Sequence, residues 1–174
     1  MARLEGVAHA LILWFSSPVL MPLIPSSFVA SVQQRVIYGD TDQMGVVYYA
    51  NYLRFFELGR LEYFRLRGGR VADLEAAGFA LPVAEVEAQY RAPARYEDLV
   101  VVNARVTELK RASLRFGYEL RREADGVLLC TGSTVHACIT RQGRPVRLPE
   151  GLTRLLVDAG PGDEDATGKP PAVG

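Results

Sequence analysis

Two acidic residues separated by one position stand at the start of the stretch YGDTDQMGVVYYANYLRFFELGR, which covers residues 38–60. Asp40 and Asp42 are followed by Gly45 and then by an aromatic-rich run. A carboxylate at such a place can act as a nucleophile or general base, or it can simply bond backbone amides in a turn. The pair could also hold Mg²⁺, a chemistry expected with a parallel sheet that carries further acids. The surrounding elements must decide among these uses.

A long amphipathic helix is predicted directly after the acids, over residues 49–66. Gly59 inside it predicts that another element packs closely there, because glycine lowers helix propensity. Gly68 and Gly69 are expected to end this helix, and a shorter one is predicted over residues 71–77. The apolar stripe of the long helix consists of Tyr49, Tyr52, Leu53, Phe56, Tyr63 and Phe64.

The hydrophobic period then changes from helical to two, which is typical of half-buried strands. Residues 127–139 are apolar or neutral on both faces, which predicts an interior strand. Turns are expected at 124–126 and 142–143, and a short closing helix around Leu152, Leu155 and Leu156. Strands are predicted over residues 32–37, 84–90, 100–106, 112–120 and 127–139. The fold class is therefore α+β, an antiparallel sheet wrapped around one long central helix, and not the alternating βαβ order of nucleotide-binding folds.

Charge and cysteine content narrow the possible partners. Twenty basic and twenty acidic residues cancel, so no global field attracts the chain to nucleic acid or to an anionic membrane. Cys130 and Cys138 fit neither a metal knuckle nor a disulfide framework. We expect reduced, buried thiols in a cytoplasmic protein, with no metal or cofactor.

The chain divides into an N-terminal extension over residues 1–30, one domain over 31–158 and a disordered tail over 159–174. Residues 7–19 are mostly apolar and faintly resemble a signal peptide, but Glu5 and His9 interrupt the pattern and Pro18 breaks it. No uninterrupted apolar stretch reaches the ~20 residues of a spanning helix. We expect an extension without a targeting role, and translation could begin at Met21.

The order of elements and the opening motif resemble the hotdog-fold acyl-CoA thioesterases of the 4-hydroxybenzoyl-CoA thioesterase-like family. A second family-like block, YRAPARYED, covers residues 90–98, and the resemblance extends over residues 32–157. The motif positions are occupied in register by Tyr38, Asp40, Asp42, Gly45, Val46, Val47, Tyr48, Tyr49, Asn51 and Tyr52.

The resemblance implies that Asp42 is the catalytic carboxylate and that the backbone N–H of Tyr49 polarises the thioester oxygen. Physical chemistry supports this assignment independently, since a helix N-terminus offers free N–H groups and a positive dipole end. Asp40 is expected to have a structural role. Gly45 lets the loop turn before the helix. The predicted substrate-binding residues are Gly45, Val46, Tyr48, Asn51, Tyr52 and Arg144.

Arg144 belongs to a cluster with Arg141 and Arg147 near the last turn; such arginines are ordinarily solvated, and Arg144 is the candidate contact for coenzyme A phosphate. Many family members carry histidine where this chain has Tyr49, so mechanisms that need an imidazole there are excluded. His136 is expected to be buried and hydrogen-bonded rather than catalytic. The family also implies a homodimer or homotetramer with sites at the subunit interface.

Two other functions remain open at this stage. A hotdog hydratase or dehydratase is one, although such enzymes depend on the histidine that Tyr49 replaces. A protein that binds or senses acyl-CoA without catalysis is the other.

Overall fold

The computed structural model describes residues 27–157. Most of the predicted extension and the whole predicted tail lie outside the described residues. The helical elements are η1 (Tyr38–Asp40), α2 (Asn51–Leu66), α3 (Val71–Ala76) and α4 (Glu150–Leu156). The strands are β1 (Ala30–Arg35), β2 (Phe79–Ala80), β3 (Val83–Tyr90), β4 (Leu99–Leu109), β5 (Ser113–Arg122), β6 (Leu128–Ala137) and β7 (Ile139–Thr140).

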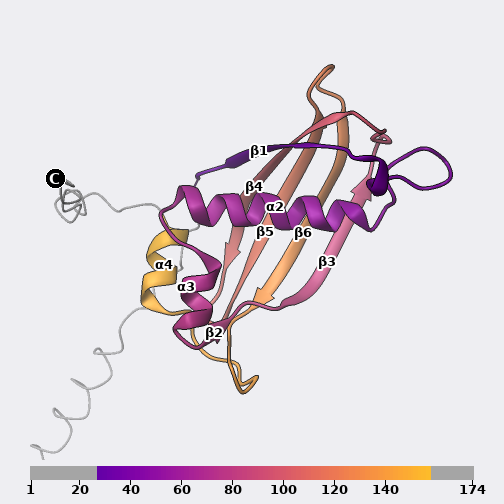
Figure 1. Cartoon of the computed structure of the whole chain (residues 1–174). Helices are drawn as coiled ribbons and strands as arrows, with labels where there is room; N and C mark the ends of the chain where they lie inside the picture. Colours follow the sequence, from indigo (N-terminus) through magenta and orange to yellow (C-terminus); the bar gives the residue numbers. More distant parts are fainter. Residues whose placement is uncertain (1–26, 158–174) are drawn as a thin grey trace, which may run out of the picture.

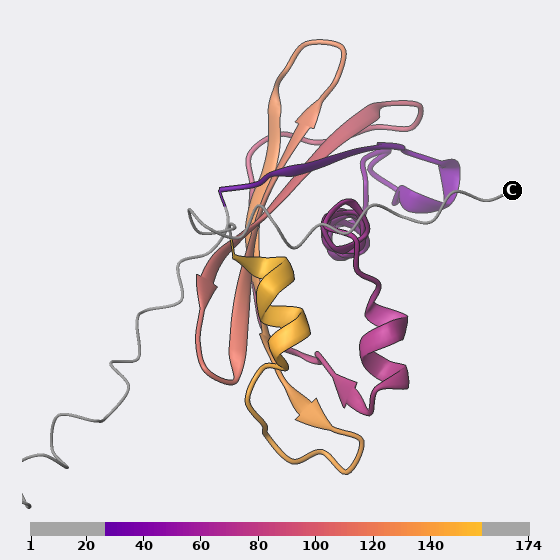
Figure 2. The ribbon, with the colours of Figure 1, turned by 90° about the vertical axis from the view of Figure 1, so that its left-hand side faces the viewer.

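Five strands form one antiparallel sheet in the order β1-β4-β5-β6-β3, and α2 crosses one face of it (Figure 1). Figure 2 shows α2 end-on against that face. This is the hotdog arrangement predicted from the sequence, and the prediction is confirmed. The small sheet of β2 and β7 was not predicted, because strands of two residues have no readable period.

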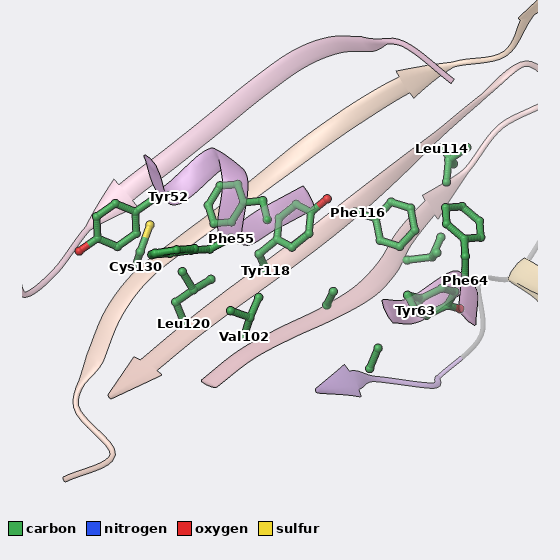
Figure 3. Close-up of a cluster of buried hydrophobic side chains, with 14 of the residues drawn as sticks. Tyr52, Phe55, Tyr63, Phe64, Val102, Leu114, Phe116, Tyr118, Leu120 and Cys130 are labelled. Carbon is green, nitrogen blue, oxygen red and sulfur yellow. The ribbon is translucent and has the colours of Figure 1, made fainter. Parts of the chain in front are cut away.

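The core lies between α2 and the helix-facing side of the sheet (Figure 3). Successive strand residues point to opposite faces, so every second residue of β4 and β5 is buried. The ring of Phe56 stacks on that of Tyr118, with centroids 4.4 Å apart. The core side chains contributed by these strands and α2 include Tyr52, Phe55, Phe56, Tyr63, Phe64, Val102, Leu114, Phe116, Tyr118 and Leu120.

The buried face of α2 differs in part from the predicted stripe. Tyr49 and Leu53 are 59% and 39% exposed, and Phe55 and Gly59 are buried instead. Tyr49 is exposed because the helix begins at Asn51, two residues later than predicted. Leu53 lies within the helix but off the face that packs on the sheet, which carries Phe55, Phe56 and Gly59. The close approach at Gly59 is confirmed, since a Cβ there would lie 2.8 Å from Cγ1 of Val102.

Strand β3 is exposed along almost its whole length, although its alternating sequence predicted a half-buried strand. The reason is its place at the edge of the sheet, where it pairs with β6 on one side only. Val83 and Val86 are among its exposed apolar side chains. An exposed edge with apolar side chains is a surface that proteins usually cover.

His136 is fully buried and hydrogen-bonded, as predicted. Its Nδ1 lies 3.0 Å from the carbonyl of Leu81, which can only accept, so Nδ1 carries the proton. Its Nε2 therefore accepts from the hydroxyl of Thr134 at 2.8 Å and from Nη1 of Arg60 at 3.1 Å. Burial lowers the pKa of His136 to about 4.

Both cysteines are buried free thiols, which confirms that part of the prediction. Burial raises the pKa of Cys130 to about 11, so this thiol stays protonated and unreactive. Of the helices within residues 27–157, none is long and apolar enough to cross a membrane.

Candidate active site

The loop that carries the two acids is closed on itself by backbone hydrogen bonds. Thr41 and Val47 form a β-bridge, and the N–H of Asp42 donates to the carbonyl of Val46 at 2.9 Å. The N–H of Gly45 donates to the carbonyl of Asp42 at 2.9 Å, in a turn that places Gly45 at a φ of 70°. Glycine reaches this left-handed region without steric cost, so the loop turns where the sequence predicted.

Asp40 is used by the fold. Its side chain is buried, with the residue only 1% exposed. Oδ2 accepts from the N–H of Ile37 at 3.1 Å and Oδ1 from Nη1 of Arg54 at 2.8 Å. Its backbone carbonyl accepts from the N–H of Tyr48 and from Nδ2 of Asn51, both at 2.9 Å. With both carboxylate oxygens bonded to N–H donors, Asp40 holds the loop against α2 and is not half of a convergent metal pair.

Asp42 has a different environment. Its Oδ1 accepts from the N–H of Met44 at 2.8 Å, a bond that fixes the side chain within the loop. Within the part of the chain that the structure describes, no donor is bonded to Oδ2. The side chain is half-buried and lines an open cleft. One oxygen is thus positioned by the backbone, and the other has no protein donor within residues 27–157.

The start of α2 leaves amide groups available beside this acid. The N–H of Asn51 donates to the carbonyl of Tyr48 at 2.9 Å, and that of Leu53 to Ala50 at 3.1 Å. The two preceding N–H groups, those of Tyr49 and Ala50, have no acceptor among residues 27–157. Free N–H groups at a helix N-terminus lie at the positive end of the helix dipole. The donor role of the Tyr49 amide toward a substrate stays a prediction.

Asp42 and Tyr49 meet in one cleft of about 310 Å³. One wall comes from the loop and the start of α2, and the other from the segment that follows β3. The lining residues are Asp42, Met44, Val46, Val47, Tyr49, Tyr52, Tyr90, Arg91, Ala92 and Pro93. The second wall was not predicted as part of the site, although the YRAPARYED block at residues 90–98 was the signal that could have found it.

The other predicted site residues lie around the cleft or away from it. Gly45 and Asn51 shape the loop rather than line the cleft. The ring of Tyr48 lies 4.5 Å from that of Tyr49, whose hydroxyl raises the pKa of Tyr48 above its ordinary value. Arg144 is exposed in the turn after β7 and is not brought together with Asp42. Its contact with coenzyme A stays a prediction.

Comparison with known proteins gives the same family as the motif. The profile of the Thioesterase-like superfamily matches residues 36–156. The acyl-CoA thioesterase YbgC of Haemophilus influenzae is 37% identical over 119 residues, which cover 67% of this chain and 85% of that protein.

Solved structures agree. A hypothetical protein from Thermus thermophilus superposes with a TM-score of 0.69 at 38% identity, covering 73% of this chain and 96% of that one. A 4-hydroxybenzoyl-CoA thioesterase structure superposes with a TM-score of 0.67 over 74% of this chain and 98% of that one. At 22% identity this second likeness shows the fold alone.

The chain belongs to the Thioesterase-like superfamily and has its hotdog fold. It is an enzyme of the thioesterase class, and the resemblance identified from the motif at residues 38–52 is confirmed.

Proposed function

We propose that this protein hydrolyses acyl-CoA thioesters to a free acid and coenzyme A, with Asp42 and the Tyr49 amide as the reacting pair. The observation that carries the proposal is their meeting in one cleft, a carboxylate with a free oxygen facing the same space as an unpaired helix N-terminal N–H. The acyl-CoA thioesterase name of the Haemophilus relative supports the substrate class.

Asp42 supplies the attack on the thioester carbonyl in one of two ways. As a nucleophile, its Oδ2 adds to the carbonyl carbon, the carbon–sulfur bond breaks, and water then cleaves the resulting anhydride. As a general base, it takes a proton from water while the water oxygen adds to the carbonyl and the thiolate leaves. Both routes need a carboxylate held within reach of the carbonyl, which the bond from Met44 provides.

The Tyr49 amide stabilises the negative charge that builds up on the carbonyl oxygen. A backbone donor that is fixed before the reaction costs no reorganisation when the charge develops. The lost histidine of the family motif has no part in this step, because the donor is the backbone and not the side chain.

Coenzyme A is strongly anionic, and the cleft has a matching cation. Arg91 lines the cleft on the side of β3 and is exposed. Its guanidinium is suited to phosphate by charge and by geometry. Arg144 is the second proposed phosphate contact, from a turn that lies outside this cleft. Free buried thiols support the cytoplasmic location that we propose.

A hydrolysis screen over acyl-CoAs, from short aliphatic to aromatic, tests the proposal. Free thiol release measures turnover on each substrate. The variant Asp42→Asn keeps the shape of the side chain but can act neither as nucleophile nor as base. We expect it to lose most turnover and to keep its thermal midpoint. Asp73→Asn, the same change at an exposed position of α3, is the matched control.

Two outcomes would contradict the proposal. Wild-type protein without hydrolysis on any acyl-CoA would rule out the reaction. Near-wild-type kcat in Asp42→Asn would show that another group attacks the thioester.

We also propose that the active form is a homodimer or homotetramer in which the exposed edge of β3 is covered by a second copy. The edge carries Val83, Val86 and Tyr90 as exposed large side chains, and Tyr90 lines the cleft. A charge at Val86, in Val86→Lys, should shift the assembly toward monomer in sedimentation experiments and lower activity with it. An unchanged assembly would place the subunit contact elsewhere.

A further inference from the structure

Tyr90 reaches across the cleft from the sheet to the segment that precedes α2. Its hydroxyl donates to the backbone carbonyl of Tyr49 at 3.1 Å, although the two residues are 41 positions apart. Its own backbone is anchored in the sheet by pairing with Cys130, and the next N–H, of Arg91, donates to Leu129 at 2.8 Å. The ring of Tyr90 also packs edge-on against Tyr52, with centroids 5.2 Å apart. Tyr90 therefore links a rigid strand to the start of the site helix.

The Tyr49 carbonyl has little other support. It lies before the first helical residue, and its one backbone donor, the N–H of Tyr52, is 3.4 Å away. That distance exceeds the usual range of 2.7–3.2 Å for such bonds. Without Tyr90, only the long bond from Tyr52 would restrain the peptide that joins Tyr49 to Ala50 at the mouth of the cleft. The N–H proposed to face the thioester, that of Tyr49, belongs to the preceding peptide, and the two peptide planes meet at the Cα of Tyr49.

We propose that Tyr90 is a positioning residue, whose hydroxyl holds the Tyr49 carbonyl so that the neighbouring amide points at the thioester oxygen. A bond to the Tyr49 carbonyl fixes the plane of the peptide that follows Tyr49, and this restrains the backbone of Tyr49 and with it the direction of the Tyr49 N–H. The Tyr49 N–H is thereby oriented before the substrate binds, so no free energy is spent on reorienting it during the reaction. This role rests on the proposed function, since it acts through the Tyr49 amide.

The variant Tyr90→Phe tests this role, because it deletes the hydroxyl and keeps the ring against Tyr52. We expect the single-turnover rate on the best acyl-CoA to fall by about fivefold, which corresponds to roughly 1 kcal/mol for one lost hydrogen bond. KM should stay within about twofold, because the bond orients the donor and does not bind substrate. NMR order parameters of the Tyr49 and Ala50 amides should fall, while the thermal midpoint stays that of the wild type.

Tyr96→Phe is the matched control. Tyr96 is 52% exposed against 47% for Tyr90, lies in the same connecting block, and stacks edge-on with Tyr38 outside the cleft. Its variant should keep the wild-type rate and the wild-type order parameters at Tyr49 and Ala50.

The outcomes separate this inference from the proposed function. An unchanged rate in Tyr90→Phe, or a raised KM at unchanged rate, overturns the positioning role while wild-type hydrolysis stands. Wild-type protein that hydrolyses no acyl-CoA overturns both. A lowered rate with unchanged order parameters at Tyr49 and Ala50 shows that the hydroxyl acts on the substrate itself, and the positioning role fails.

Discussion

Nη1 of Arg54 lies 2.8 Å from Oδ1 of Asp40, and this ion pair distinguishes the two acids of the loop, because Asp40 is bound to the helix and Asp42 is not. Arg54 is the fourth residue of α2, at the end of its first turn, so the pair ties the loop to the helix that follows it. Asp42, two positions later, points into the cleft with one oxygen free of protein donors in the described chain. Asp40 thus has a structural role, and Asp42 is left free for the catalytic role that we propose.

The variant Asp40→Asn should lower stability. It removes the negative charge that attracts Arg54. The new NH2 group is a donor, and it must face another donor, either Arg54 or the N–H of Ile37. Losing one charge-assisted bond in a buried site corresponds to about 2 kcal/mol in the free energy of unfolding. Urea unfolding measures this change. The slope of the unfolding free energy against urea concentration should be the same as in the wild type. Asp73→Asn on exposed α3 should change stability by less than about 0.5 kcal/mol. A stable Asp40→Asn without turnover would instead indicate a direct catalytic role for Asp40.

Periodic segments were predictable from the sequence because their burial follows from position along the element. The alternation of apolar and polar residues in β4 and β5 predicted which side chains face the core. Gly59 within α2 predicted the close approach of another element. The buried role of Asp40 followed from the ordinary behaviour of aspartate in turns.

The parts that the sequence did not reveal depend on which segments meet in space. The start of α2 moved to Asn51, where backbone bonds of the loop end. The exposure of β3 depends on its place at the edge of the sheet, which the pattern of one strand does not encode. The contact of Tyr90 with Tyr49 joins residues 41 positions apart, and no local pattern indicates it.

The hydroxyl of Tyr49 should matter much less than its amide. Tyr49→Phe keeps the amide, the ring and the start of the helix, so kcat should fall by less than about tenfold, under ~1.4 kcal/mol of barrier. Loss of a true oxyanion donor costs about a hundredfold or more. Turnover at saturating substrate, compared with that of Asp42→Asn, measures the difference once both variants are shown to fold. Equal damage in the two variants would mean that the phenol takes part as a proton donor or charge stabiliser.

Stability should fall in mild acid because of His136. Its pKa is lowered to about 4 by burial, whereas an unfolded histidine titrates near 6.5. Between these two pKa values the unfolded chain therefore binds more protons than the folded protein. The contribution of His136 to the free energy of unfolding is complete above pH ~6.5 and decreases as pH falls toward 4. This contribution amounts to about 3 kcal/mol at most. The positive charge of Arg60 beside Nε2 also lowers the pKa of His136, as burial does.

The variant His136→Gln removes this titration. Wild-type and variant unfolding free energies, measured at several pH values from 4 to 7.5, should differ by an amount that shrinks as pH falls. The carboxylates titrate in both proteins and cancel in the comparison. A constant difference over this range would mean that His136 has the same pKa in the folded and unfolded chain, and a difference that grows as pH falls would mean that the folded protein holds His136 charged.

The same substitution at two helical glycines should have opposite effects. In Gly59→Ala the new Cβ would lie 2.8 Å from Cγ1 of Val102 and 3.1 Å from Cβ of Ala104, two fully buried residues of β4. Overpacking of this kind costs about 1–3 kcal/mol, against a gain of about 1 kcal/mol in helix propensity, so a net loss of about 1 kcal/mol is expected. Gly151 in α4 has open space where its Cβ would stand, so Gly151→Ala should stabilise by up to about 1 kcal/mol. Urea unfolding of both variants and the wild type measures the two changes in unfolding free energy, which should have opposite signs. Stabilisation by Gly59→Ala would show that α2 can move away from β4 at little cost, contrary to the close packing described above.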